Sequence, residues 1–167
     1  MRILGIDPGT ATTGFGIIEE KSKFSYAVHD FGTISTPPEH TDSQRLHTIH
    51  SNTSEIIANY NPDCIAIEKL YFFRNTTTVI TVAQARGVVL LAGEQHGADI
   101  HEFTPLQIKQ ALTGYGKAPK EQMKQMVQHT LKLPSLPKPD DAADGLAVAL
   151  CRAQSNVELE ALKKSKG

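Results

Sequence analysis

The 167-residue sequence has few cysteines, no excess of either charge and no long apolar run. Its two cysteines form no CxxC pair, so neither a disulfide framework nor a zinc ribbon is available. The formal net charge of −1 excludes a strongly charged, disordered protein. No stretch approaches the ~18 apolar residues of a membrane span, and the N-terminus lacks a signal-peptide pattern. We therefore expect a cytosolic protein whose Cys64 and Cys151 are buried and reduced.

The length suits one globular domain with a core large enough to fold without a metal or disulfide. Apolar patterning and turn residues predict strands at 2–7, 14–19, about 24–35, 63–68 and 98–103. They predict helices at 42–60, about 76–96, 105–112, from 119 onward, and from 140 or 141 to 153. Three strands followed by alternation indicate an α/β domain, with a mixed five-stranded β-sheet flanked by α-helices. We expect this domain to span 1–153, with a poorly ordered tail over 154–167.

Acidic residues occupy the ends of two predicted strands and the start of the last predicted helix. Asp7 ends the first strand, and Glu68 ends the apolar strand DCIAIE. The carboxyl ends of strands in open α/β sheets are where ligands collect, so neighbouring strands would bring these two acids together. Asp141 and Asp144 are three residues apart and share a helix face. Three distant segments can thus deliver carboxylates to one point.

Such a cluster needs relief from repulsion, since a like-charged pair ~4 Å apart costs about 4 kcal/mol at an effective dielectric of 20. Either protonation with a raised pKa or a divalent cation can supply it. Ligands that are all oxygen favour Mg²⁺ or Mn²⁺, and carboxylate-held Mg²⁺ is suited to phosphodiester hydrolysis. Taken singly, each acid could instead be a turn residue or a helix cap, and we interpret Asp140 as a cap.

Four segments, taken in order, carry a resemblance to a known family. They read MRILGIDPGTATTGFG, IAIEKLYFFRN followed by QARG, FTPLQIKQALTGYGKAPKEQM, and DDAADGLAVAL. Together they resemble the RuvC family of bacterial Holliday-junction endonucleases, within the ribonuclease H-like superfamily, over about 1–153. The resemblance implies a ribonuclease H-like fold in which Asp7, Glu68, Asp141 and Asp144 are the metal-binding catalytic acids. Some relatives carry histidine where Asp141 stands, so the fourth ligand varies.

The same resemblance implies an activity and its partners. A homodimer would cleave four-way DNA junctions by symmetric nicks in opposing strands, leaving 5′-phosphate and 3′-hydroxyl ends. The implied cofactor is Mg²⁺, with Mn²⁺ as a substitute and two ions per active site. The RuvA–RuvB branch-migration complex is the implied partner, and the bacterial cytoplasm the implied location.

A basic segment and an aromatic segment are candidates for DNA contact. Over 101–138 the chain has six lysines against two glutamates, a local charge of +4 that suits phosphate contacts. The resemblance singles out Lys109 and Lys120, and Lys117 follows the flexible Gly-Tyr-Gly turn. The family also places a base-stacking aromatic after the second catalytic strand, where Tyr71, Phe72 and Phe73 follow one another. An ungapped count back from QARG selects Tyr71, with Arg74 nearby, while Phe72 could fill a core or interface and Phe73 stays open. Solvated helix faces and aromatics that fill a core or dimer interface are the simpler interpretations.

Three other functions share part of these features. GIDPGT also resembles the first phosphate loop of sugar kinases and actin-like ATPases, although the chain supplies only one such domain. A related ribonuclease H-like nuclease of the YqgF type would process RNA, but it usually lacks a segment like TGYGKAPK. A non-catalytic scaffold would bind junctions without cutting them. Replacing Asp7 would distinguish an enzyme, which loses cleavage, from a scaffold, which has none to lose.

Overall fold

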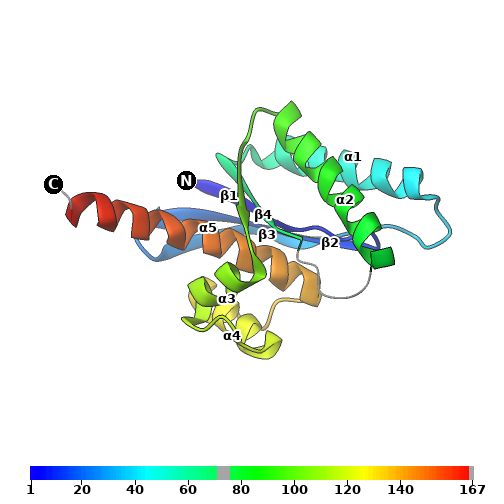
Figure 1. Cartoon of the computed structure of the whole chain (residues 1–167). Helices are drawn as coiled ribbons and strands as arrows, with labels where there is room; N and C mark the ends of the chain where they lie inside the picture. The colour runs from blue at the N-terminus through cyan, green and yellow to red at the C-terminus, as the bar shows by residue number, and fades with distance from the viewer. Residues whose placement is uncertain (71–75, 166–167) are drawn as a thin grey trace.

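A mixed sheet forms the centre of the computed structural model, which describes residues 1–70 and 76–165, with side chains for 1–70 and 78–155. Within those residues five strands pair in the order β3-β2-β1-β4-β5, as Figure 1 shows. The strands are β1 (Arg2–Asp7), β2 (Thr12–Ser22), β3 (Ser25–Ser35), β4 (Cys64–Glu68) and β5 (Asp99–Phe103). The first three are antiparallel, while β4 lies parallel to β1 and β5 parallel to β4. The predicted α/β class and mixed five-stranded sheet are confirmed.

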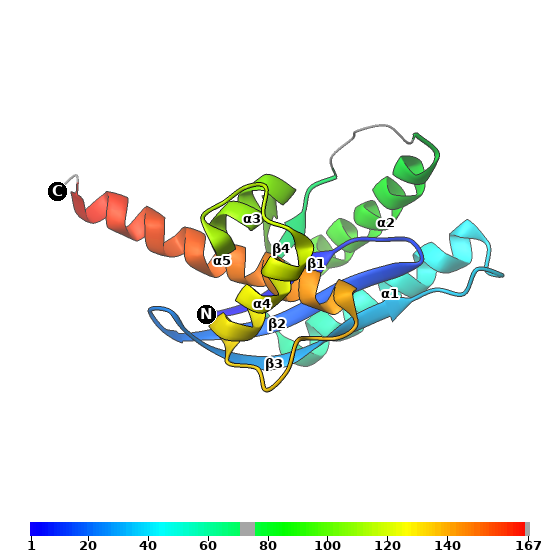
Figure 2. The ribbon, with the colours of Figure 1, turned by 90° about the horizontal axis from the view of Figure 1, so that it is seen from below.

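Helices cover both faces of the sheet (Figures 1 and 2). One face packs against α1 (Asp42–Tyr60) and α2 (Thr76–Gln95). The other packs against α3 (Pro105–Thr113), α4 (Lys120–Leu131) and α5 (Asp140–Ser165). No helix in the described part of the chain is long and apolar enough to cross a membrane.

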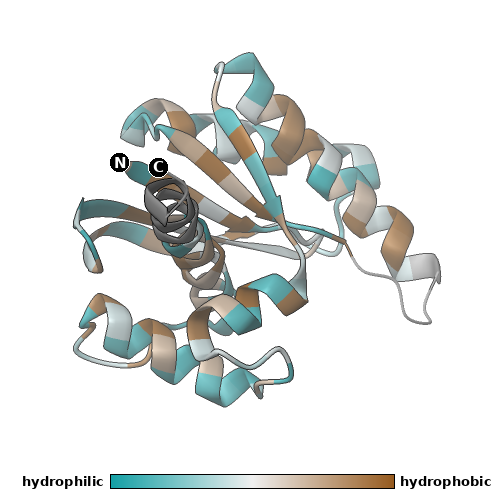
Figure 3. Cartoon of the chain, turned by 60° about the vertical axis from the view of Figure 1, so that its left-hand side comes forward, coloured by the Kyte–Doolittle hydropathy of each residue, from teal (hydrophilic) through white to brown (hydrophobic). Residues whose placement is uncertain are grey.

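The two faces alternate along each central strand, so the sheet separates two apolar cores. In β4, Ile65 and Ile67 pack toward α1 and α2, while Cys64 and Ala66 pack toward α5. This follows from the period of two in a strand, where successive side chains point to opposite faces. Figure 3 shows apolar residues along the central strands and along α2. Cys64 and Cys151 are both buried, as expected.

Helix and strand ends agree with the sequence pattern in some places and not in others. Thr104 caps α3, since its hydroxyl accepts from the Gln107 amide and Pro105 follows at the first helical position, in agreement with the helix predicted from 105. Strand β2 is longer than predicted because hairpin pairing with β3 carries through polar residues to Ser22. The expected end of the last helix near 153 was wrong, because α5 continues to Ser165. Residues 154–165 are rich in good helix formers and contain no glycine or proline, so nothing in them ends the helix.

The expectation that Asp140 or Asp141 caps the last helix was also wrong. The Pro139 carbonyl accepts from the Ala142 amide, so α5 begins at Asp140 with Pro139 in the preceding cap position. Asp140 therefore lies in the first turn, where its carboxylate pairs with Lys124 of α4 at 3.3 Å. A carboxylate in this turn is favourable because the exposed amides of a helix start carry partial positive charge.

Candidate active site

Asp7 and Glu68 lie on the same face of the sheet because side chains alternate between the two faces along each strand. Ile6 pairs with Ile67 in the parallel ladder between β1 and β4, so the next residue of each strand lies at the same end. Asp7 shares its parity with Gly5, which faces α5, and Glu68 shares its parity with Ala66, which packs in the α5 core. The neighbouring-strand arrangement assumed from the sequence is confirmed.

Glycines on β1 and β2 let α5 lie directly against the sheet. A Cβ on Gly14 would overlap the backbone carbonyl of Asp141, and a Cβ on Gly5 would overlap the carbonyl of Gly145. Gly145 in turn faces the backbone of Phe15: a Cβ on Gly145 would lie only 2.5–2.7 Å from the Phe15 backbone atoms. Because no side chain separates helix from strand here, the first turn of α5 carries its acids to the end of β1. This close packing was not predicted from the sequence, although the Gly-x-Gly of β2 is a readable signal for it.

Three carboxylates meet in this space. Asp7, Asp141 and Asp144 each offer one oxygen, and these atoms all lie within 4.8 Å of one another. Glu68 joins the cluster through a hydrogen bond with the Asp7 carboxyl. All four acids singled out from the sequence are thus in one site, with Glu68 attached through Asp7 rather than within the tight triad. Asp140 is outside the triad, which favours the register with Asp141.

Burial and mutual repulsion change the protonation of the cluster. Burial, followed by the charges of Glu68 and Asp144, raises the pKa of Asp7 to about 8 from its ordinary value of 3.8. Burial also raises the pKa of Glu68, although its hydrogen bond with Asp7 and the nearby Lys109 and Lys120 oppose that rise. Without a cation, Asp7 therefore holds a proton near neutral pH and donates it to Glu68.

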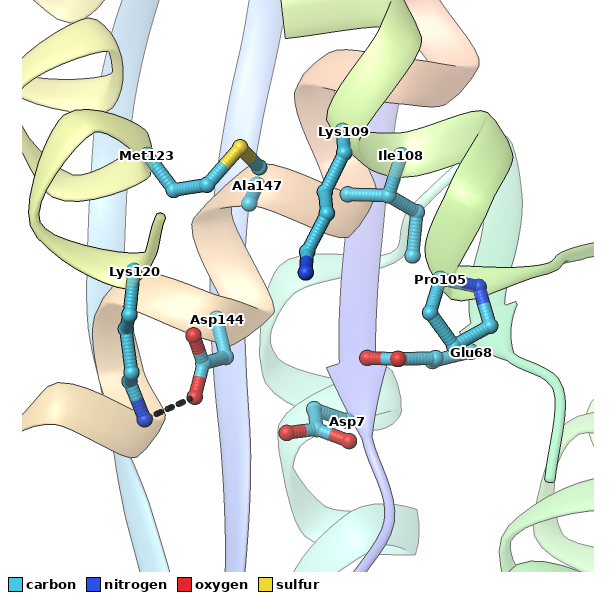
Figure 4. A pocket seen from close by; sticks show the side chains of 9 residues that line it. All are labelled: Asp7, Glu68, Pro105, Ile108, Lys109, Lys120, Met123, Asp144 and Ala147. Carbon is cyan, nitrogen blue, oxygen red and sulfur yellow. Dashed lines mark hydrogen bonds and ion pairs between the residues drawn. The ribbon is translucent and has the colours of Figure 1, made fainter. Parts of the chain in front are cut away.

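Lysines from α3 and α4 border a cavity of about 240 Å³ above these acids. Figure 4 shows Lys109 pointing into the space over Asp7 and Glu68, and Lys120 reaching Asp144 from the other side. The Lys120 Nζ lies 3.1 Å from the Asp144 carboxylate. Burial raises the pKa of Asp144, and the Lys120 ion pair opposes that rise. The cavity thus combines a negative floor with a positive rim, an arrangement suited to a phosphate group and a hard cation.

A second, smaller cavity of about 190 Å³ shares Asp7 and Glu68 as part of its wall. It also takes in Lys69 after β4 and Arg86 of α2. Arg86 forms an ion pair with Glu102 of β5, and the Lys69 Nζ lies 3.9 Å from the same carboxylate. This group of charges was not predicted from the sequence, although Arg86 belongs to the QARG segment.

The candidate DNA-contact residues divide into three groups. Lys109 and Lys120 line the larger cavity, next to the acids. Lys117 is exposed in the turn between α3 and α4 and does not line that cavity. Tyr71 and Arg74 lie outside the described residues, so their predicted roles stay predictions.

Comparison with known proteins gives one consistent result. A family model described as crossover junction endodeoxyribonuclease RuvC matches residues 3–152. A protein of that name from Clostridioides difficile is 48% identical over 100% of this chain and 98% of its own length. Its namesake from Caldicellulosiruptor saccharolyticus is 49% identical over 93% of this chain and 94% of its own. The solved structure of Thermus thermophilus RuvC with a Holliday junction substrate superposes with a TM-score of 0.89, at 33% identity, over 93% of this chain and 94% of that one.

Proposed function

Because this chain belongs to the RuvC family of crossover junction endodeoxyribonucleases, we propose that it cuts four-way (Holliday) DNA junctions by paired, symmetric nicks in recombination and repair. The observation that carries the proposal is the meeting of Asp7, Asp141 and Asp144 beneath a lysine-bordered cavity. Four-way DNA as the ligand is supported by the Thermus thermophilus relative, whose structure holds such a substrate. The products would be a 5′-phosphate and a 3′-hydroxyl end.

The acid cluster fits hard divalent cations, because its donors are all carboxylate oxygens and its burial leaves their repulsion uncompensated. Asp7, Glu68, Asp141 and Asp144 would hold two Mg²⁺ ions, for which Mn²⁺ could substitute. When bound, such ions supply an activated water and stabilise the leaving 3′-oxygen of an in-line displacement.

The two lysines that line the cavity and the proton held between Asp7 and Glu68 have separate roles in this proposal. Lys109 and Lys120 would bind the phosphate that is cut and offset its charge above the acids. Lys120 would exchange its ion pair with Asp144 for the DNA backbone as the strand enters. Asp7 would lose the proton that it donates to Glu68 before both groups can act as anionic ligands.

The remaining contacts are proposed on the family resemblance and on the surface of the chain. Lys117 would contact DNA outside the catalytic cavity. Tyr71 and Arg74 would also contact DNA, with Tyr71 stacking on a base. A homodimer would match a two-fold protein to a two-fold junction. It is supported by exposed apolar side chains on α2, among them Ile80 at 61% and Leu91 at 50% exposure.

Three further features complete the proposal. The RuvA–RuvB branch-migration complex would be the partner, and the enzyme would act in the bacterial cytoplasm, where chromosomal junctions arise. Residues 1–153 would suffice as the nuclease domain. A chain ending after Ala153 should then still nick junctions at the same positions as the full chain.

The test is cleavage of a synthetic mobile four-way junction in Mg²⁺ and then in EDTA. Paired nicks at symmetric positions should appear in Mg²⁺ and vanish in EDTA. Asp7→Asn should bind the junction and leave it uncut. Glu39→Gln, which also converts an acid to its amide but at an exposed position on the loop before α1, should cut normally. Tight binding without nicks in either Mg²⁺ or Mn²⁺ would favour the scaffold. Cleavage of structured RNA in preference to junctions would favour the RNA-processing nuclease.

A further inference from the structure

An aromatic ring stands exposed on the turn that joins α3 to α4. Tyr115 is 57% exposed, and the neighbouring Leu106 of α3 is also 57% exposed. Gly116, next to Tyr115, lies against Leu106, and exposed apolar side chains grouped in this way mark interaction sites. Neither has a role in the catalytic proposal above.

The backbone of the turn is held so that the ring of Tyr115 stays outside. Gly114 ends α3 with a positive φ of 71°, and its amide donates to the Gln110 carbonyl at 2.8 Å. The Tyr115 amide donates to the Thr113 hydroxyl at 3.1 Å, and the Tyr115 carbonyl accepts from Ala118 at 3.1 Å. A side chain on a fixed backbone, with only two rotatable bonds of its own, loses little entropy when it binds.

The turn folds back along α3 toward the acid cluster. A Cβ on Gly116 would overlap the Leu106 side chain, so the turn lies against the first turn of α3. Pro105, next to Leu106, and Lys109, one turn further on, both line the catalytic cavity. The chain after the turn reaches Lys120, which lines the same cavity from α4. The ring of Tyr115 therefore sits in a turn whose two ends both enter the wall of the site.

We propose that Tyr115 is a stacking surface for a nucleobase of the junction, next to the strand that enters the cavity; this rests on the proposed function. The surrounding charges identify the ligand, because the exposed Lys117 is two residues from Tyr115 in the same turn, and Lys109 of α3 lines the cavity that this turn borders. Both lysines match a phosphate backbone. Aromatic rings in positive grooves stack on bases whose faces are open. Such faces are available at the centre of a four-way junction and are covered in continuous duplex, so the contact favours the junction.

The absence of tryptophan from the chain gives a direct probe. A Tyr115→Trp variant carries a single tryptophan, whose emission a stacked base should quench. Titration with an uncut junction in EDTA should quench it saturably, and an equal length of duplex should quench it much less. The matched control is Phe24→Trp: Phe24 is 60% exposed and has Lys23 5.4 Å from its ring centre, but lies at the opposite end of the sheet from Asp7. Its emission should barely change.

Affinity measurements separate stacking from charge. Tyr115→Ala should weaken junction binding roughly tenfold at every salt concentration, without changing the slope of log Kd against log salt. Tyr115→Phe should restore the affinity, while Lys117→Ala should lower the slope by about one. Phe24→Ala should bind like the unaltered chain.

Two results would overturn the proposal for Tyr115 alone. One is an unaltered chain that binds and cuts junctions while Tyr115→Ala binds equally well. The other is quenching of Tyr115→Trp that is as strong with duplex as with junction. Failure of the unaltered chain to bind or cut any junction is distinguishable, because it removes the proposed function itself. Equal thermal unfolding of Tyr115→Ala and the unaltered chain checks that weaker binding is not loss of fold.

Discussion

Asp7→Asn should stabilise the metal-free protein while abolishing cleavage. The raised pKa of Asp7, about 8 against an ordinary 3.8, means that the folded state holds a proton that the unfolded state has released. Below pH 4 both states are protonated and the effect is absent. Between about pH 4 and pH 8 the free energy of unfolding falls by about 1.4 kcal/mol for each pH unit. Asparagine has no such titration, and its amide can donate to Glu68 as the protonated Asp7 does.

The expected size follows from that slope. From pH 5 to pH 7 the advantage of Asp7→Asn over the unaltered chain should grow by about 3 kcal/mol. Burial and repulsion raise the pKa of Glu68 and Asp144 too, but those groups are present in both proteins and largely cancel in the difference. Urea unfolding in EDTA at several pH values measures the advantage directly. Glu39→Gln, an acid-to-amide change at an exposed position, is the control measured beside it.

Divalent cations should reverse the comparison. Mg²⁺ or Mn²⁺ binds the folded unaltered chain and stabilises it in proportion to RT ln(1 + [L]/Kd), whereas Asp7→Asn has lost a ligand and gains less. The reasoning would be refuted by an Asp7→Asn advantage that stays constant from pH 5 to pH 8 in EDTA. An unaltered chain that gains stability relative to the variant as pH rises would refute it as well.

Three further substitutions test particular contacts. Lys120→Gln removes the ion pair with Asp144 and should tighten Mn²⁺ binding to the DNA-free protein by about 1.4- to fivefold, since exposed pairs contribute about 0.2–1 kcal/mol; unchanged affinity by calorimetry would contradict it. Glu102→Gln removes the partner of Arg86 and should lower the free energy of unfolding by about 1 kcal/mol, measured in urea. Gly14→Ala places a methyl group against the α5 backbone and should cost about 3 kcal/mol together with most cleavage; a variant as stable as the unaltered chain would show that α5 can move away.

Much of the fold could be predicted because its signals are local. The alternation of apolar residues in DCIAIE, the Thr-Pro start of α3 and the stop at Asn61-Pro62 each depend on a few neighbouring residues. The end of α5 was missed because helix formers without an apolar stripe give a weak pattern, yet they continue a helix that is already formed. The cap of α5 was missed because Asp140 and Pro139 both suit a helix start, and only backbone geometry separates their positions.

The site was predictable in its residues and less so in its contacts. Asp7 and Glu68 are each the last residue of a strand, and both face the same side of the sheet. Their meeting therefore required only that β1 and β4 be neighbours. The pairs Lys120–Asp144 and Arg86–Glu102 join segments 24 and 16 residues apart, and local sequence does not indicate which charges meet.

By itself, the sequence determined which residues are the candidates for the site: four acids on two strands and one helix, and lysines concentrated in 101–138. The periodicity of apolar residues and the order of the segments along the chain suffice to place these residues on their strands and helices, because secondary structure depends on local backbone geometry. Only the tertiary structure decided how close the acids come and which of them holds a proton. Both depend on α5 lying against the glycines of β1 and β2, which buries Asp7 beside Glu68, Asp141 and Asp144 and makes its charge costly.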